Sequence, residues 1–182
     1  MQVRRIVTGF DAEGRGCVVS DGPAPRSHDF EHIPGFSNTL VWMTDDSAPT
    51  GTPSDLTLTT PSVIPGPSAS GLTVVKFPPA ASFESADPAA SAAEQEQALP
   101  GLAAAFDADR PGFHTTATVD YVIVLEGELH LKLDRGPEIA VRPGDVVIQN
   151  GTAHAWTNRT SEPAVIAAVS IGTKPGRPSS TA

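Results

Sequence analysis

The sequence predicts an all-β fold, a sandwich or barrel of short strands, on two observations. Residues 113–171 alternate between short apolar runs and turn signals rich in Gly, Pro, Asn and Asp. Short strands at this regular spacing are typical of β-sandwiches and β-barrels. The 18 prolines and 16 glycines of the 182-residue chain are also spread between the apolar runs, which favours many turns over long helices.

The first half of the chain predicts fewer strands. A turn at 11–14 separates two apolar runs and predicts a hairpin, and two further runs follow. These predicted strands cover residues 4–8, 16–20, 39–44 and 72–77. Residues 21–34 between them indicate a loop.

Two segments leave alternatives open. Residues 45–71, rich in Pro, Ser, Thr and Gly, predict a long irregular arm that is either a lid or a clasp around a second subunit. The Ala-rich residues 85–107 predict either a short helix, interrupted at Pro100, or a mobile linker.

The second half predicts a ladder of six strands separated by turns. They cover residues 113–125, 128–133, 139–141, 146–149, 153–158 and 164–171. We therefore expect one structural domain in three parts: an N-terminal extension, 1–109, that packs on or swaps into the barrel, a barrel core, 110–172, and a flexible tail, 173–182.

Charge and composition exclude several function classes. A net charge of −9 disfavours a nucleic-acid or anionic-membrane partner, because phosphate contacts need a basic patch. No run of 18 apolar residues predicts a membrane span, and no apolar stretch of signal-peptide length follows Arg4 and Arg5. The single cysteine, Cys17, allows no intramolecular disulfide. We expect a soluble, cytoplasmic protein.

Polar side chains gather on one face of two predicted strands. Side chains alternate between faces along a strand, so His114, Thr116, Thr118 and Asp120 share one face of 113–125, with Val122 further along it. On the later strand, His154, Trp156 and Asn158 share a face in the same way. If the two strands are neighbours in a barrel, the two imidazoles can converge on one ion.

The spacing of these residues resembles the two motifs of the cupin superfamily. In the first motif a His-x-His pair is followed by a carboxylate and a glycine; here His114, Thr116, Asp120 and Gly127 stand at those positions. The second motif is Gly-Asp, a strand, and then Pro-x-Gly-x-x-His-x-x-x-Asn. Its positions are filled here by Gly144, Asp145, Gln149, Gly151, His154 and Asn158. Gln149 replaces the proline and Thr116 the second histidine. The N-terminal region resembles the extension of a bacterial and fungal subgroup.

The resemblance implies a cupin double-stranded β-helix, or jelly-roll barrel, that binds a divalent metal ion (Fe, Zn, Mn or Ni) through His114, Asp120 and His154. His114 and Asp120 are then also the expected catalytic residues. Asp120 is one methylene shorter than the usual glutamate, so it must sit nearer the ion or act through a water. The expected substrate contacts are Thr116, Thr118, Val122, Trp156, Asn158 and Trp42. Both tryptophans could instead be core residues. Cupins of this size are commonly dimers, so the resemblance also implies a homodimer with the N-terminal strands in its interface.

The sequence leaves three functions open. The first is a metal-dependent enzyme that acts on a small organic acid, ketone or polyketide-like molecule of secondary metabolism by Lewis-acid and proton-transfer chemistry, as an isomerase, dehydratase, decarboxylase or cyclase. The second is an Fe(II)-dependent dioxygenase, because two imidazoles and one carboxylate form the facial set of such enzymes. The third is a non-catalytic module that binds a small molecule.

Overall fold

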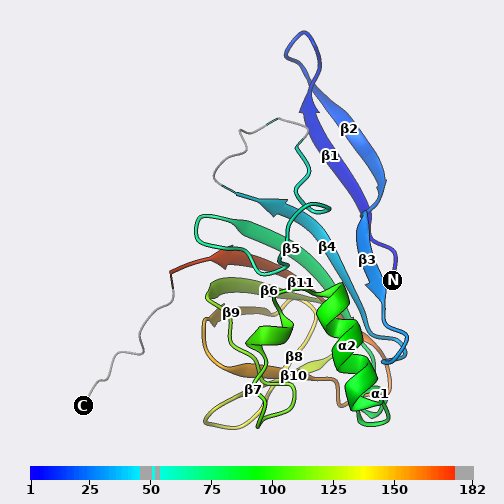
Figure 1. Ribbon diagram of the computed structural model, residues 1–182, viewed down its shortest axis with the longest axis vertical. Helices are drawn as coiled ribbons and strands as arrows, with labels where there is room; N and C mark the ends of the chain where they lie inside the picture. The colour runs from blue at the N-terminus through cyan, green and yellow to red at the C-terminus, as the bar shows by residue number, and fades with distance from the viewer. Residues whose placement is uncertain (46–50, 52–53, 175–182) are drawn as a thin grey trace, which may run out of the picture.

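Two facing β-sheets form the body of the protein in the computed structural model, which describes residues 1–45, 51 and 54–174 (Figure 1). Parts of the predicted arm and most of the predicted tail lie outside the described residues. The larger sheet has the order β3 (Arg26–Asp29), β4 (Ser37–Thr44), β5 (Ser70–Phe77), β11 (Ala164–Gly172), β6 (Thr118–Glu126) and β9 (Val146–Asn150). The smaller sheet has the order β10 (His154–Thr157), β7 (Leu129–Leu133) and β8 (Ile139–Val141).

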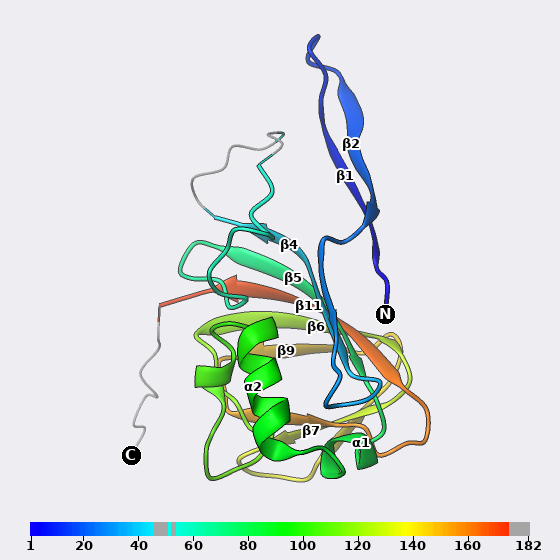
Figure 2. The same ribbon diagram turned by 45° about the vertical axis from the view of Figure 1, so that its right-hand side comes forward.

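All neighbouring strands in these sheets run antiparallel, and the apolar core lies between the sheets. Its members come from both halves of the chain: Phe30, Ile33, Phe36, Val75, Leu99, Val122, Val124, Leu129, Val141, Ala164 and Ile166. Figure 2 shows β6 and β9 on one side of the barrel and β7 on the other. The predicted all-β jelly-roll fold is confirmed.

A separate hairpin stands apart from this body. Within the described residues, strands β1 (Arg4–Phe10) and β2 (Gly16–Pro23) pair only with each other, and they project away from the barrel in both views (Figures 1 and 2). At its base, Arg5 forms an ion pair with Asp55 and donates a hydrogen bond to the carbonyl of Val41. The rest of the N-terminal region joins the body, because β5 pairs directly with β11.

Residues 85–107 contain a helix, as the first of the two alternatives predicted. Helix α2 (Pro88–Ala98) begins after Asp87, whose carboxylate accepts hydrogen bonds from the backbone N–H groups of Ala89 and Ala90. This N-cap and a proline at the first helical position are both typical helix starts. Two shorter helical turns flank α2, namely α1 (Ala81–Glu84) and the 3₁₀ turn η1 (Ala103–Ala105). No helix in the described parts of the chain is long and apolar enough to cross a membrane.

Two predicted boundaries are wrong. Residues 21–34 contain β3, which pairs with β4; the prolines and glycines around it conceal a strand of only four residues. The strand predicted from residue 113 begins at Thr118, because His114 makes only isolated bridges, to Phe106 and His154, and the N–H of Thr115 donates to the carbonyl of Ala105. Within β6 the predicted alternation holds, with Asp120 buried and Tyr121 exposed.

Candidate metal centre

The structure brings the two motif histidines together. The backbone N–H of His114 donates to the carbonyl of His154 at 3.0 Å, and the reverse bond measures 3.1 Å. The two imidazole centroids lie 4.2 Å apart. The predicted convergence of His114 and His154 is therefore observed, although it arises from a short bridge and not from a continuous strand.

Both imidazoles have a fixed tautomer. Nδ1 of His154 lies 3.0 Å from the carbonyl oxygen of Thr152, and Nδ1 of His114 lies 3.4 Å from that of Gly112. A carbonyl can only accept a hydrogen bond, so each Nδ1 carries the proton. Each Nε2 is then left with a free lone pair, which is the form in which histidine binds a metal ion.

The environment keeps both rings neutral. Burial, and then the neighbouring ring of His154, lower the pKa of His114 to about 4, and the Gly112 carbonyl and the negative charge of Asp120 only partly oppose this. Burial likewise lowers the pKa of His154. Neutral imidazoles at physiological pH are suited to bind a metal ion or to accept a proton.

Asp120 lies on the inner face of β6, and one oxygen of its carboxylate is buried without a hydrogen bond. The residue is 8% exposed, and its Oδ1 is buried without a hydrogen-bond partner. Most buried polar atoms are paired, so an unpaired carboxylate oxygen indicates a missing ligand, ion or proton. However, no three side chains of His, Cys, Asp or Glu in residues 1–45, 51 and 54–174 gather closely enough to hold one metal ion. The structure thus brings His114 and His154 together and does not gather Asp120 with them into a three-ligand cluster.

Three predicted substrate contacts lie on β6 or just before it. The hydroxyl groups of Thr116 and Thr118 hydrogen bond to each other at 2.7 Å, and Thr118 is almost fully buried. Val122 is 3% exposed and belongs to the core cluster. Trp156 meets His154 edge to face, with 6.2 Å between ring centroids, and also packs against the core.

Asn158 and Trp42 are not part of this group. The side-chain amide of Asn158 donates hydrogen bonds to the carbonyls of Phe77 and Glu162 and accepts hydrogen bonds from Thr160. Its donors and its acceptor are therefore all used to hold a loop in place. Trp42 pairs with Leu72, and this register places it on the sheet face opposite Asp120, under the guanidinium of Arg5. We therefore no longer propose either residue as a substrate contact.

Sequence analysis missed the role of Gln149. Its buried amide donates to the Thr152 carbonyl at 2.8 Å, the same oxygen that accepts from Nδ1 of His154, and also bonds to the Thr152 hydroxyl. Gln149 therefore positions the residue that orients His154. The signal was visible, because this glutamine stands where the resembled motif has proline.

Comparison with known proteins agrees with this geometry. Residues 107–171 match the family model described as "Cupin domain". Oryzines biosynthesis cluster protein J of Aspergillus oryzae is 46% identical over 48 residues, which are 26% of this chain and 27% of that protein. The cupin-domain-containing oxidoreductase fogC of Aspergillus ruber is 41% identical over 64 residues, 35% of this chain and 27% of that protein.

The matches cover only part of each relative. The matched segments span 27–29% of the length of the curated relatives. Among solved structures, a sugar phosphate isomerase of a cupin superfamily from Silicibacter pomeroyi superposes with a TM-score of 0.41 and 19% identity, over 78% of this chain and 62% of that one. The family match, together with the two-sheet barrel and the paired histidines, shows that residues 107–171 form a cupin domain.

Proposed function

We propose that the protein is a cytoplasmic, metal-dependent enzyme that acts on a small organic acid, ketone or polyketide-like molecule. The observation that carries the proposal is the pair of neutral imidazoles of His114 and His154, 4.2 Å apart, with both Nδ1 atoms held and both Nε2 atoms free. The names of several relatives, which are biosynthesis cluster proteins, support a role in secondary metabolism.

The donor chemistry of the site fits a divalent metal ion. His114 and His154 would hold the ion, and the unpaired Oδ1 of Asp120 supplies negative charge on the same inner face. A bound divalent ion would act as a Lewis acid on a carbonyl or enolate oxygen of the substrate. The ordinary preferences of imidazole admit Zn, Fe, Mn and Ni at this place.

The chain's own residues would orient the substrate and move its proton. Asp120 is buried and carries an unpaired oxygen, so we assign its carboxylate as the proton acceptor. Thr116 and Thr118 offer a hydroxyl pair next to it. Val122 and Trp156 would form the apolar wall that excludes water from the reacting atoms. Isomerisation, dehydration and cyclisation would use this proton abstraction, whereas decarboxylation would instead need a proton delivered to the carbon atom that CO₂ leaves.

Metal analysis of protein purified without chelator tests the proposal. We expect bound Zn, Fe, Mn or Ni in the wild type and less than a tenth of it in His154→Ala and in His114→Ala. His32→Ala is the matched control, since His32 is exposed and its ring lies away from the pair. Equal metal content in all four proteins would contradict the proposal.

Iron-dependent oxidation is the second candidate function. Three relatives matched over 64 residues carry the name cupin-domain-containing oxidoreductase. Two imidazoles and a carboxylate also suit non-haem Fe(II). Oxygen consumption by the Fe(II)-loaded protein with its substrate would favour this candidate. Turnover by the Zn-loaded protein under nitrogen would exclude it, and tight binding without any turnover would favour a non-catalytic module.

We also propose a homodimer, because two apolar surfaces lack cover from residues 1–45, 51 and 54–174. The outer face of the large sheet exposes Tyr121, Leu125, Val146 and Ile148, and the hairpin exposes Ile6, Phe10, Val18 and Val19. A two-stranded hairpin is marginally stable alone and gains from packing on another sheet. The eight half-exposed side chains offer roughly 800 Å², which is about what each partner buries in a stable interface. A second copy can satisfy both surfaces at once by twofold symmetry.

A further inference from the structure

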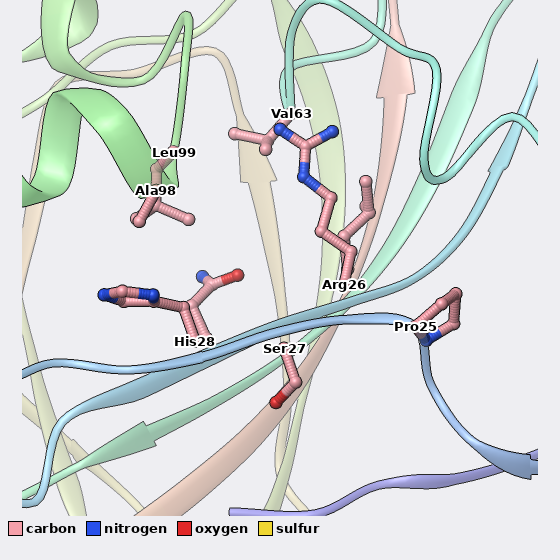
Figure 3. A pocket seen from close by; sticks show the side chains of 9 residues that line it. Pro25, Arg26, Ser27, His28, Val63, Ala98 and Leu99 are labelled. Atoms are coloured by element: carbon pink, nitrogen blue, oxygen red, sulfur yellow. The ribbon is translucent and has the colours of Figure 1, made fainter.

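A cavity lies between helix α2 and the inner face of the large sheet, at its β3 edge (Figure 3). Its volume is about 200 Å³. Its lining is polar on the side of the sheet and apolar on the side of the helix, and consists of Pro25, Arg26, Ser27, His28, Asn38, Leu40, Val63, Ala98 and Leu99. None of these residues belongs to the candidate metal centre.

Arg26 brings an unneutralised charge to this cavity. Its Nη1 donates to the carbonyl oxygens of Thr57, at 3.2 Å, and Thr60, at 3.1 Å. No carboxylate within the described ranges lies at ion-pair distance from it, and its Nε and Nη2 groups make no hydrogen bond there. By contrast, six other arginines have carboxylate partners: Arg4, Arg5, Arg15, Arg110, Arg142 and Arg159. The two carbonyls fix the guanidinium and leave donors for an anion.

Asn38 adds an amide that has no partner. The residue is 9% exposed and lies opposite His28 in the pairing of β3 with β4, so both side chains face the cavity. Its side chain makes no hydrogen bond to any other described residue. Its amide atoms are not among the fully buried unpaired atoms, so they remain accessible at the cavity wall and are available to hydrogen bond a polar ligand.

The neighbouring carboxylate of Glu94 does not compete for the hydrogen-bond donors of Arg26 and Asn38. Glu94 of α2 accepts hydrogen bonds from the backbone N–H groups of Glu31 and His32 and contacts Nε2 of His28 at 2.8 Å. These bonds outweigh its desolvation and lower the pKa of its carboxyl group. Glu94 thus locks α2 onto the loop after β3 and holds the ring of His28 beneath Ala98 and Leu99, as Figure 3 shows.

We propose that this cavity binds a small carboxylic acid with an apolar body. The carboxylate would accept hydrogen bonds from the free guanidinium donors of Arg26 and from the amide of Asn38. The apolar body would lie against Leu40, Val63 and Leu99. A cavity of about 150 Å³ is known to hold benzene, so about 200 Å³ accommodates a ring with one carboxylate. Benzoate is therefore a suitable probe.

The test compares benzoate with its neutral isostere benzamide by isothermal titration calorimetry on the full chain. We expect benzoate to bind in the millimolar range or tighter, and benzamide at least about tenfold more weakly, because a charge-assisted contact to Arg26 contributes about 1.5–3 kcal/mol. Asn38→Asp places a like charge beside the carboxylate, and Ala98→Phe fills the apolar end. Each should weaken benzoate binding by about tenfold or more.

Two controls separate this site from the metal centre and from misfolding. His154→Ala should bind benzoate as the wild type does, since no lining residue touches that histidine. The melting temperature of each variant is compared with that of the wild type. If Asn38→Asp does not fold, Asn38→Ser replaces it in the binding experiment. The proposal is overturned if benzoate fails to bind in the millimolar range, if benzamide binds equally well, or if folded Asn38 and Ala98 variants bind benzoate unchanged.

Discussion

Gln149 and His154 donate hydrogen bonds to one acceptor, the carbonyl oxygen of Thr152, at 2.8 and 3.0 Å. This shared oxygen links the end of β9 to the histidine that begins β10. The bond from Nδ1 sets the tautomer of His154, while the glutamine fixes the turn that presents the carbonyl. Gln149 is thus a positioning residue for the proposed metal ligand.

Removing this support should weaken metal binding more than it weakens the fold. We expect Gln149→Ala to lower the affinity for Zn²⁺ or Mn²⁺ about 10–100-fold, the range found when second partners of metal-binding histidines are removed. The loss of two buried hydrogen bonds should lower the free energy of unfolding by about 1–3 kcal/mol. Metal titration checks the affinity, with the exposed Gln97→Ala as control. An unchanged affinity in a folded Gln149→Ala protein would show that the glutamine is only structural.

The histidine pair should make stability depend on pH in the metal-free protein. Burial depresses the pKa of His114 from 6.5 to about 4, so the unfolded chain takes up a proton more readily than the folded one. The stabilisation is therefore present above pH 6.5 and is lost as the pH falls towards 4. The full effect is about 3 kcal/mol. Urea unfolding in the presence of a chelator measures it, and His114→Gln should flatten the curve. Parallel curves for the two proteins would refute the assignment.

Asp120 should show opposite effects on stability and on metal binding. Its buried, unpaired oxygen costs free energy in the metal-free protein. We expect Asp120→Asn to raise the free energy of unfolding by about 1 kcal/mol in chelator, because the buried charge is removed. The same substitution should lower metal affinity and turnover. Thermal unfolding with and without metal provides both readouts. A variant destabilised under both conditions would mean that the carboxylate has an ordinary structural role.

The sequence was informative wherever local pattern and spacing decide the structure. The alternation of buried and exposed residues along β6 and the barrel itself followed from short apolar runs, and the convergence of His114 with His154 from motif spacing. The late start of β6 at Thr118 was not foreseen, because residues 113–115 bond to residues 105–107, a contact that the apolar pattern does not reveal.

Contacts between distant segments lay beyond local pattern. The cavity needs Arg26 and Asn38 from paired strands and Leu99 from the end of α2, and only the register of β3 with β4 and the docking of Glu94 bring them together. Trp42 was misplaced for the same reason: a register shift between Leu40 and Trp42 decides which face of the sheet it occupies.

Asn158 should affect stability and leave the chemistry unchanged. Its amide holds the carbonyls of Phe77 and Glu162 and accepts from Thr160, at 2% exposure. We expect Asn158→Ala to lower the free energy of unfolding by about 2–4 kcal/mol, because several buried groups lose their partners together. Metal content per folded protein should stay as in the wild type. Loss of metal from a folded Asn158→Ala protein would show that Asn158 supports metal binding after all.

The proposed dimer predicts that single charges on its surfaces produce monomers. Ile148 is 57% exposed on β9 and pairs with Tyr121, and Phe10 is 61% exposed near the tip of the hairpin. A buried, unpaired carboxylate costs several kcal/mol, so Ile148→Asp and Phe10→Asp should each raise the dimer dissociation constant by a hundredfold or more. Light scattering at micromolar concentration measures the mass. Ile139→Asp, at an apolar residue on β8 that is 49% exposed, is the control and should stay dimeric. If only Ile148→Asp dissociates the dimer, the outer sheet face forms the interface without the hairpin. A monomeric wild type would rule out both surfaces.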